Sequence, residues 1–241
     1  MRPLAAAISF LTRIPLGRTV TFDAADVANA AGWFPMVGLL LGAICAALAA
    51  VLRDHLPGVL VAVILVACDA LLTGALHFDG LADTADGFGG GKSRDDILRI
   101  MRDHCIGSYG GTALALLIGW KIAAYSAVLQ RGHWFLAIIL VPALGRWSIL
   151  MLSAALPYAR TTPSVVREMG KSALVWGTLT MAVALGTSQL WRAGAAAGVA
   201  IVVTACFGFY CRRKINGITG DTLGANVQLC ECAALAVFLW I

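Results

Sequence analysis

The sequence predicts an all-α membrane protein, a polytopic helix bundle of about seven transmembrane helices with an N-terminal interfacial or re-entrant helix. The first observation is the composition: 60% of the 241 residues are hydrophobic and 13% are charged, whereas charged residues make up about 25% of a soluble domain. The second is that the apolar residues form runs of about 20 residues, the length that crosses a bilayer. A soluble enzyme is excluded, and so is a disordered chain, because disordered chains are poor in large apolar groups.

Seven apolar runs are the candidate spans, and they lie at about residues 32–52, 57–76, 109–129, 134–155, 173–190, 194–210 and 224–241. Pro35, Pro57 and Pro142 lie near the ends of these runs or inside them, where membrane helices tolerate proline if neighbouring helices satisfy the freed backbone groups. The many Gly and Ala residues favour close helix packing. Residues 4–11 form an apolar stretch too short to span, so we expect an interfacial or re-entrant helix there. The whole of 1–241 is expected to be a single integral membrane domain.

The basic residues predict the orientation of the bundle. Thirteen of the 18 Lys and Arg residues lie in the N-terminal segment and in the loops after the second, fourth and sixth runs. They are Arg2, Arg13, Arg18, Lys92, Arg94, Arg99, Arg102, Arg160, Arg167, Lys171, Arg212, Arg213 and Lys214. The opposite loops hold only Arg53, Arg131 and Arg192. The positive-inside rule then makes the first set cytoplasmic, and the net charge of +5 indicates contact with membrane lipid rather than with nucleic acid.

An unusual cluster of aspartates follows the second run. Six of the 13 acidic residues lie between residues 79 and 103, and this stretch contains no Glu. On a helix, Asp79, Asp83 and Asp86 share one face, where like charges one turn apart repel each other unless a cation compensates them. Mg²⁺ takes carboxylate oxygens and phosphate, so we predict that these three residues are metal ligands. The alternative is a solvated loop, which would use Glu and Lys more freely.

Basic residues follow the aspartates directly. Gly89, Gly90 and Gly91 precede Lys92; this run lacks the spacing of a Walker A motif, and both a phosphate cradle and a flexible hinge stay open. Arg94, Arg99 and Arg102 add fixed positive charge near the carboxylates, a combination typical of metal-assisted phosphoryl transfer. We predict that Lys92, Arg94 and Arg99 bind substrate, and that Arg102 acts in catalysis, with Arg94 or Arg102 on the leaving phosphate.

Five ionisable residues lie within spans or at their ends: Asp69, Lys121, Arg146, Asp221 and Glu231. Charges at membrane depth are costly and usually face a partner or a water-filled cavity. For Asp69, both a place in the site cavity and pairing with Lys121 or Arg146 stay open. Asp221 and Glu231 are predicted to form a second substrate-binding wall.

Several motifs resemble one known family. They are FLTRIP at 10–15, GALHFDGLADTADGFGGG at 74–91, RIMRDHCIGSYG at 99–110, GRW at 145–147, PYAR at 157–160 and GITGDTLGANVQLCE at 217–231. Together they cover most of the chain in order, and with them the sequence resembles cobalamin synthase, the adenosylcobinamide-GDP ribazoletransferase family.

The resemblance implies a Mg²⁺-dependent reaction in the cytoplasmic (inner) membrane of a bacterium, with the active site on the cytoplasmic side. The ribose hydroxyl of α-ribazole or its 5′-phosphate attacks the cobinamide-linked phosphorus of adenosylcobinamide-GDP and releases GMP. We predict Asp103 as general base or additional ligand, Asp86 as a further catalytic carboxylate, and His77, Arg146 and Arg160 as substrate contacts. The resemblance also allows a homo-oligomer or a complex with other enzymes of the cobalamin pathway.

Two alternatives stay open. CDP-alcohol phosphotransferases carry a related acidic motif, Asp-x-x-Asp-Gly-x-x-Ala-Arg, but its spacing is not met around Asp79 and Asp83. A transporter would concentrate polar residues near the middle of the bilayer and often shows an internal repeat. Here the polar residues gather at the cytoplasmic boundary, which favours the enzyme.

Overall fold

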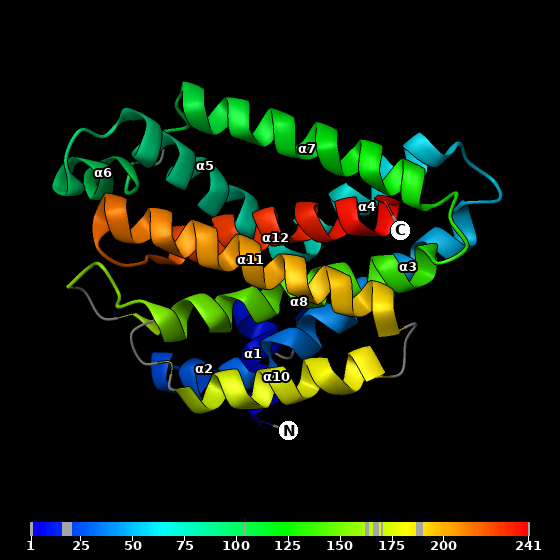
Figure 1. Ribbon diagram of the computed structural model, residues 1–241, viewed down its shortest axis with the longest axis horizontal. Helices are drawn as coiled ribbons and strands as arrows, with labels where there is room; N and C mark the ends of the chain where they lie inside the picture. Colours follow the sequence, from blue (N-terminus) through cyan, green and yellow to red (C-terminus); the bar gives the residue numbers. More distant parts are fainter. Residues whose placement is uncertain are drawn as a thin grey trace.

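The computed structural model describes residues 2–15, 21–103, 105–161, 164–165, 169, 171–186 and 190–240. These residues form a helical bundle (Figure 1), and their only pairing of extended backbone is an isolated bridge between Tyr158 and Ile218. The elements are α1 (Arg2–Leu11), α2 (Ala24–Ala30), the 3-10 helix η1 (Ala31–Trp33), α3 (Phe34–Leu52), α4 (Gly58–Thr73), α5 (Leu76–Gly90), α6 (Arg94–Ile100), α7 (Ser108–Val128), α8 (Trp134–Ala155), α10 (Lys171–Gly186), α11 (Leu190–Ile215) and α12 (Gly220–Trp240). The predicted all-α class is confirmed.

The number of spans differs from the predicted seven. Five helical segments are long and apolar enough to cross a membrane, and they are Ala24–Leu52, Ser108–Val128, Trp134–Ala155, Trp191–Ile215 and Gly220–Trp240. A sixth is reached only if α4 and α5, which are bent by 90° at their junction, count as one broken span. Helix α10 has 16 residues, and the predicted span 173–190 runs beyond it into residues outside the described part. The protein is therefore multi-pass, but a count of seven is not confirmed.

The bend between α4 and α5 has a local cause. Gly74 and Ala75 both adopt left-handed backbone, with φ of 63° and 59°, which ends α4. The N-terminal segment packs on this break: the Arg13 amide donates to the Leu72 carbonyl at 2.6 Å, and a Cβ on Gly74 would lie 2.4 Å from Arg13 Nε. The predicted run 57–76 therefore splits at Gly74 and Ala75, and α5, which carries the aspartates, continues at 90° to α4.

Small residues let the helices approach closely. Gly38 and Gly42, one turn apart on α3, face α8, and a Cβ on them would lie 2.5 Å from Ala143 Cα and 2.4 Å from the Ile139 carbonyl oxygen. This small-xxx-small pattern is a common way to pack helices in a membrane.

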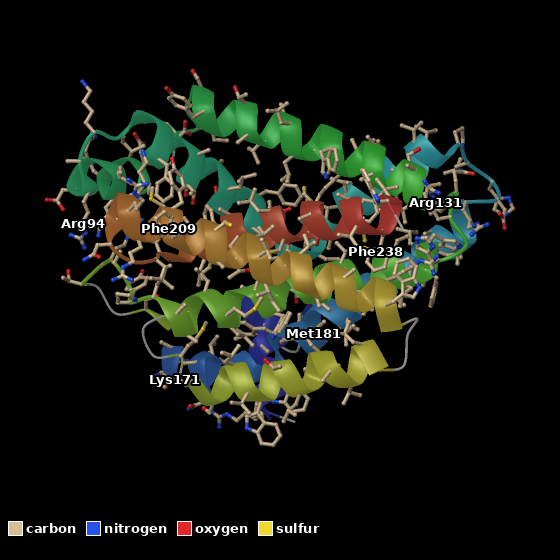
Figure 2. All side chains as sticks on the ribbon, viewed as in Figure 1. Arg94, Arg131, Lys171, Met181, Phe209 and Phe238 are labelled. Atoms are coloured by element: carbon tan, nitrogen blue, oxygen red, sulfur yellow. The ribbon has the colours of Figure 1, made fainter. Side chains whose placement is uncertain are left out.

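The connections at the two ends of the bundle differ in charge. Arg94 and Lys171 lie at one end and Arg131 lies at the other (Figure 2). The first end carries α6, the connection after α8 and the connection from α11 to α12 (Figure 1). These are the segments in which the sequence concentrates basic residues; Arg18 and Arg167 of that set lie outside the described residues.

Candidate active site

Helix α5 and the start of α12 approach each other through glycine. A Cβ on Gly80 would lie 2.7 Å from the Asp221 carbonyl oxygen, and a Cβ on Gly224 would lie 3.3 Å from Gly80 Cα. Larger side chains at these positions would push the helices apart. The close approach places the aspartates of α5 beside Asp221, although some 140 residues separate them in the chain.

This packing gives a stability prediction. Gly80→Ala should lower the free energy of unfolding by about 1–3 kcal/mol, the usual cost of overpacking, because the new methyl group meets backbone that cannot rotate away. Gly119→Ala on α7 is the matched control, since nothing lies within 4 Å of its would-be Cβ and alanine favours helix by up to about 1 kcal/mol over glycine. Thermal unfolding in detergent measures both. Equal melting temperatures for the two variants would contradict the assigned contact.

The first turn of α12 is fixed by a reciprocal cap. The Thr219 amide donates to Thr222 Oγ1 at 2.8 Å and the Thr222 amide donates to Thr219 Oγ1 at 3.2 Å, which satisfies amides that a helix start leaves without partners. Thr219 Oγ1 also donates to Asp221 Oδ2 at 3.2 Å. The Asp221 carboxylate is therefore held in one orientation.

Two of the sequence motifs are joined just before this turn. Ala159 donates its amide to the Ile218 carbonyl at 2.7 Å, and Ile218 donates to the Pro157 carbonyl at 2.9 Å. A Cβ on Gly217 would lie 2.4 Å from that Pro157 oxygen. The bridge brings Arg160 to α12, where its Nη2 donates to Asp221 Oδ2 at 2.9 Å.

A small cavity lies where α1, α5, α8 and α12 meet. We call it the acidic cavity; its volume is about 140 Å³, and its lining includes Phe10, His77, Asp79, Gly80, Ile149 and Asp221. His77 is buried, and none of the described residues forms a hydrogen bond with its Nε2. The structure therefore brings together three of the predicted site residues, His77, Asp79 and Asp221.

Asp83 and Asp86 face different surroundings. Asp83 is half-buried one turn beyond Asp79, repelled by Asp79, Asp221 and Asp86 and attracted by Arg160. Asp86 is buried, and its two carboxylate oxygens accept from the amides of Gly107 and Gly110 at 2.7 and 2.9 Å. A carboxylate at a helix N-terminus is stabilised by the helix dipole. Asp86 thus caps α7, a role that the predicted set of metal and catalytic residues did not include.

A second cavity lies beside α6. We call it the arginine cavity; its volume is about 410 Å³, and its charged lining consists of Arg94, Asp95, Arg99, Arg102 and Arg160. The four predicted arginines therefore surround one space, and the ion pair from Arg160 to Asp221 links it to the acidic cavity.

The four guanidinium groups are not equally available. Arg94 donates to the backbone carbonyls of Ile215 and Ala159 at 3.0 and 2.6 Å. It therefore mainly connects α6 to the end of α11 and to the segment after α8. Arg99 donates to Asp96 at 2.5 Å, and this bond together with one from the Lys92 amide lowers the pKa of the half-buried Asp96 carboxyl.

Three predicted features lie outside both cavities. Lys92 is exposed, and its backbone amide donates a hydrogen bond to the Asp96 carboxylate. Asp103 is exposed and accepts from the Cys105 amide at 3.3 Å, so its position gives no support for the predicted general base. Gly89 and Gly90 form the last turn of α5 instead of a cradle, and a Cβ on Gly89 would lie 2.6 Å from the Tyr109 ring.

The charges at membrane depth pair with one another. Lys121 Nζ lies 2.5 Å from Glu231 Oε2 and 3.5 Å from Asp69 Oδ2. Arg146 lies 3.3 Å from Asp69 Oδ1 and also bonds Glu231. We call these four residues the charge ring. The two pairings left open for Asp69 are both present, and the ring is formally neutral. Arg146 and Glu231 were predicted to bind substrate, but neither lines a cavity described above.

The chain matches a family model described as "Cobalamin-5-phosphate synthase" over residues 3–239. It belongs to this family. Curated relatives named adenosylcobinamide-GDP ribazoletransferase include those of Syntrophobacter fumaroxidans (37% identical, over 95% of each chain), Ralstonia nicotianae (38%, over 99% of this chain and 95% of the relative) and Rhizobium etli (39%, over 96% and 94%). No solved structure matches it significantly. The predicted family, and with it the prediction of an enzyme, is confirmed.

The position of Asp79, Asp83 and Asp86 on one helix face predicted that all three are Mg²⁺ ligands. In the described part of the chain, no group of three or more His, Cys, Asp or Glu side chains is arranged to hold a metal, because Asp86 is turned to α7. Mg²⁺ in phosphate sites often takes only one or two protein carboxylates and completes its shell with substrate phosphates and water. Asp79 and Asp83, which face Asp221, fit such a site; the predicted set of three is reduced to two.

The N-terminal helix of this synthase-family chain was not predicted to reach the site. Phe10 and Leu11 of α1 line the acidic cavity, and Arg13 contacts the break that starts α5. The FLTRIP motif at 10–15 pointed to a role for this segment. However, an apolar helix too short to span the membrane does not show which other helices it packs against.

Proposed function

We propose that this chain is a Mg²⁺-dependent adenosylcobinamide-GDP ribazoletransferase, which joins adenosylcobinamide-GDP to α-ribazole or α-ribazole 5′-phosphate and releases GMP. The observation that carries the proposal is the pairing of a carboxylate-lined cavity with an arginine-lined one through Arg160 and Asp221, 2.9 Å apart. Both cavities belong to the basic end of the bundle, and the positive-inside rule supports a site on the cytoplasmic face of the inner membrane as part of this proposal.

The chemistry is displacement at the cobinamide-linked phosphorus. The acceptor's ribose oxygen forms a bond to that phosphorus, the bond to the GMP oxygen breaks, and the hydroxyl proton leaves to a base. Mg²⁺, when bound, neutralises charge on the diphosphate and on the leaving oxygen. Asp79 and Asp83 would hold it.

The remaining side chains orient the reactants. Asp221, fixed by Arg160 and Thr219, forms the wall opposite Asp79 and is placed to accept a hydrogen bond from the attacking hydroxyl. His77, buried below Asp79 with a free Nε2, supplies a polar group at the floor of the cavity. Holding reactants in this way is a large part of catalysis in phosphoryl transfer.

Metal removal tests the proposal. The purified protein in detergent, given adenosylcobinamide-GDP and α-ribazole 5′-phosphate, should release GMP with Mg²⁺, lose that activity in EDTA and regain it when Mg²⁺ is returned. GMP and the corrinoid product are followed by chromatography. A folded protein that releases no GMP under any of these conditions would overturn the assignment, and CDP-alcohol substrates and then transport would be assayed. Full activity in EDTA would refute the requirement for a metal ion but not the assigned reaction.

A further inference from the structure

The arginine cavity is more positive than the proposed diphosphate chemistry requires. Four guanidinium groups line it. Three of them each pair with a carboxylate, that of Asp95, Asp96 or Asp221, so the lining keeps a net positive charge through Arg102. The volume of the cavity, about 410 Å³, is within the range of small-ligand sites. A site of this kind accepts a phosphate dianion without a metal ion.

Two of the arginines keep donors free. Arg102 is exposed, and within the described residues no hydrogen bond or ion pair engages its side chain. Arg160 uses Nη2 on Asp221 and on the Met101 carbonyl, yet its Nε is buried without an acceptor. A buried donor without a partner costs free energy, and a bound anion would supply the missing acceptor.

The acidic cavity has the opposite character. Its carboxylates repel phosphate unless a cation is bound, so a diphosphate whose charge is neutralised by a cation would belong there, together with the phosphate of the leaving GMP. The phosphate that still lacks a positive partner is the one carried by the acceptor. We propose that the arginine cavity is the subsite for the 5′-phosphate of α-ribazole 5′-phosphate, with Arg102 and Arg160 as its free donors and Arg99, which pairs with Asp96, beside them, and that these arginines set the ratio in which the phosphorylated and unphosphorylated acceptors are used.

This inference rests on the proposed function and differs from the sequence-based expectation that Arg94 or Arg102 holds the leaving phosphate. Arg94 is engaged with two backbone carbonyls, which leaves it as part of the wall. Arg160 lines the arginine cavity and bonds Asp221, which lines the acidic cavity. This bond would set the position of the acceptor phosphate relative to the reacting hydroxyl.

The test compares two acceptors in the same reaction, with the same enzyme and the same donor substrate. The value of kcat/KM is measured with α-ribazole 5′-phosphate and with α-ribazole, each at saturating adenosylcobinamide-GDP and Mg²⁺. We expect the wild-type protein to prefer the phosphorylated acceptor. Arg102→Met and Arg99→Met should each lower the ratio of the two kcat/KM values by about 10- to 100-fold, as expected for lost charge-assisted hydrogen bonds. Arg102→Lys should lie between wild type and Arg102→Met.

The control is Arg131→Met, which removes an exposed arginine at the opposite end of the bundle (Figure 2) and should leave the ratio as in wild type. Equal efficiency of the two acceptors in wild type, or an unchanged ratio in both Arg99 and Arg102 variants, would overturn the inference. If these variants instead weaken product inhibition by GMP while the ratio holds, the cavity binds the leaving nucleotide and the inference is wrong. Absence of GMP release with either acceptor overturns the proposed function, and this inference with it.

Discussion

Asp83→Asn should lose more than about 100-fold in the rate of GMP release while the protein stays folded. Replacing groups that only support metal ligands costs about 10–100-fold, and Asp83 is proposed to be a ligand. The substitution keeps the shape of the side chain and removes its charge. Because Asp83 is repelled by Asp79, Asp86 and Asp221, the variant should be as thermostable as wild type or more so, the trade-off expected of a functional site.

The measurement pairs a GMP-release assay with thermal unfolding of the same preparation. Asp79→Asn should show the same loss of activity. Asp54→Asn is the matched control: its side chain is 76% exposed, it lies in the connection between α3 and α4, and neither rate nor melting temperature should change. An Asp83→Asn protein that turns over at the wild-type rate would remove the acidic cavity from the mechanism.

Lys121→Met should produce the largest loss of stability. Lys121 is fully buried between Glu231 and Asp69, so the substitution leaves two carboxylates facing Arg146 alone. Removing one partner of a buried ion pair costs about 3–5 kcal/mol. The prediction is a sharply lower melting temperature in detergent and poor recovery from the membrane.

A second substitution separates charge balance from packing. In Lys121→Met with Glu231→Gln, the remaining pair of Asp69 and Arg146 is neutral again, so the double variant should be more stable than Lys121→Met, a coupling that a double-mutant cycle measures. Lys171→Met, at an exposed position, is the control and should be neutral. Additive losses in the double variant would show that the four charges do not act as a ring.

The membrane class, most helix positions and the family could be predicted from the sequence. Apolar runs and basic loops can be recognised within a single segment of the sequence, because the hydropathy of a segment determines whether it enters the lipid and the charge of a loop determines its side of the membrane. The metal-assisted chemistry that we propose was predicted from the motif around Asp79 and Asp83 for a similar reason, since the spacing of carboxylates on one helix face is local. The number of spans could not be predicted in this way. Gly74 and Ala75 have left-handed backbone and divide an apolar run that is continuous in hydropathy.

The sequence by itself therefore determined that this is a multi-pass helical enzyme of the synthase family and which segments carry its charges. Only the tertiary structure decided what each charge does. Asp86 caps a helix because α7 begins beside it, Arg146 and Glu231 neutralise Lys121 and Asp69, and Arg160 reaches Asp221 through a backbone bridge between distant segments. Electrostatic partners are set by distance in space, and in a helix bundle the nearest opposite charge commonly comes from another helix.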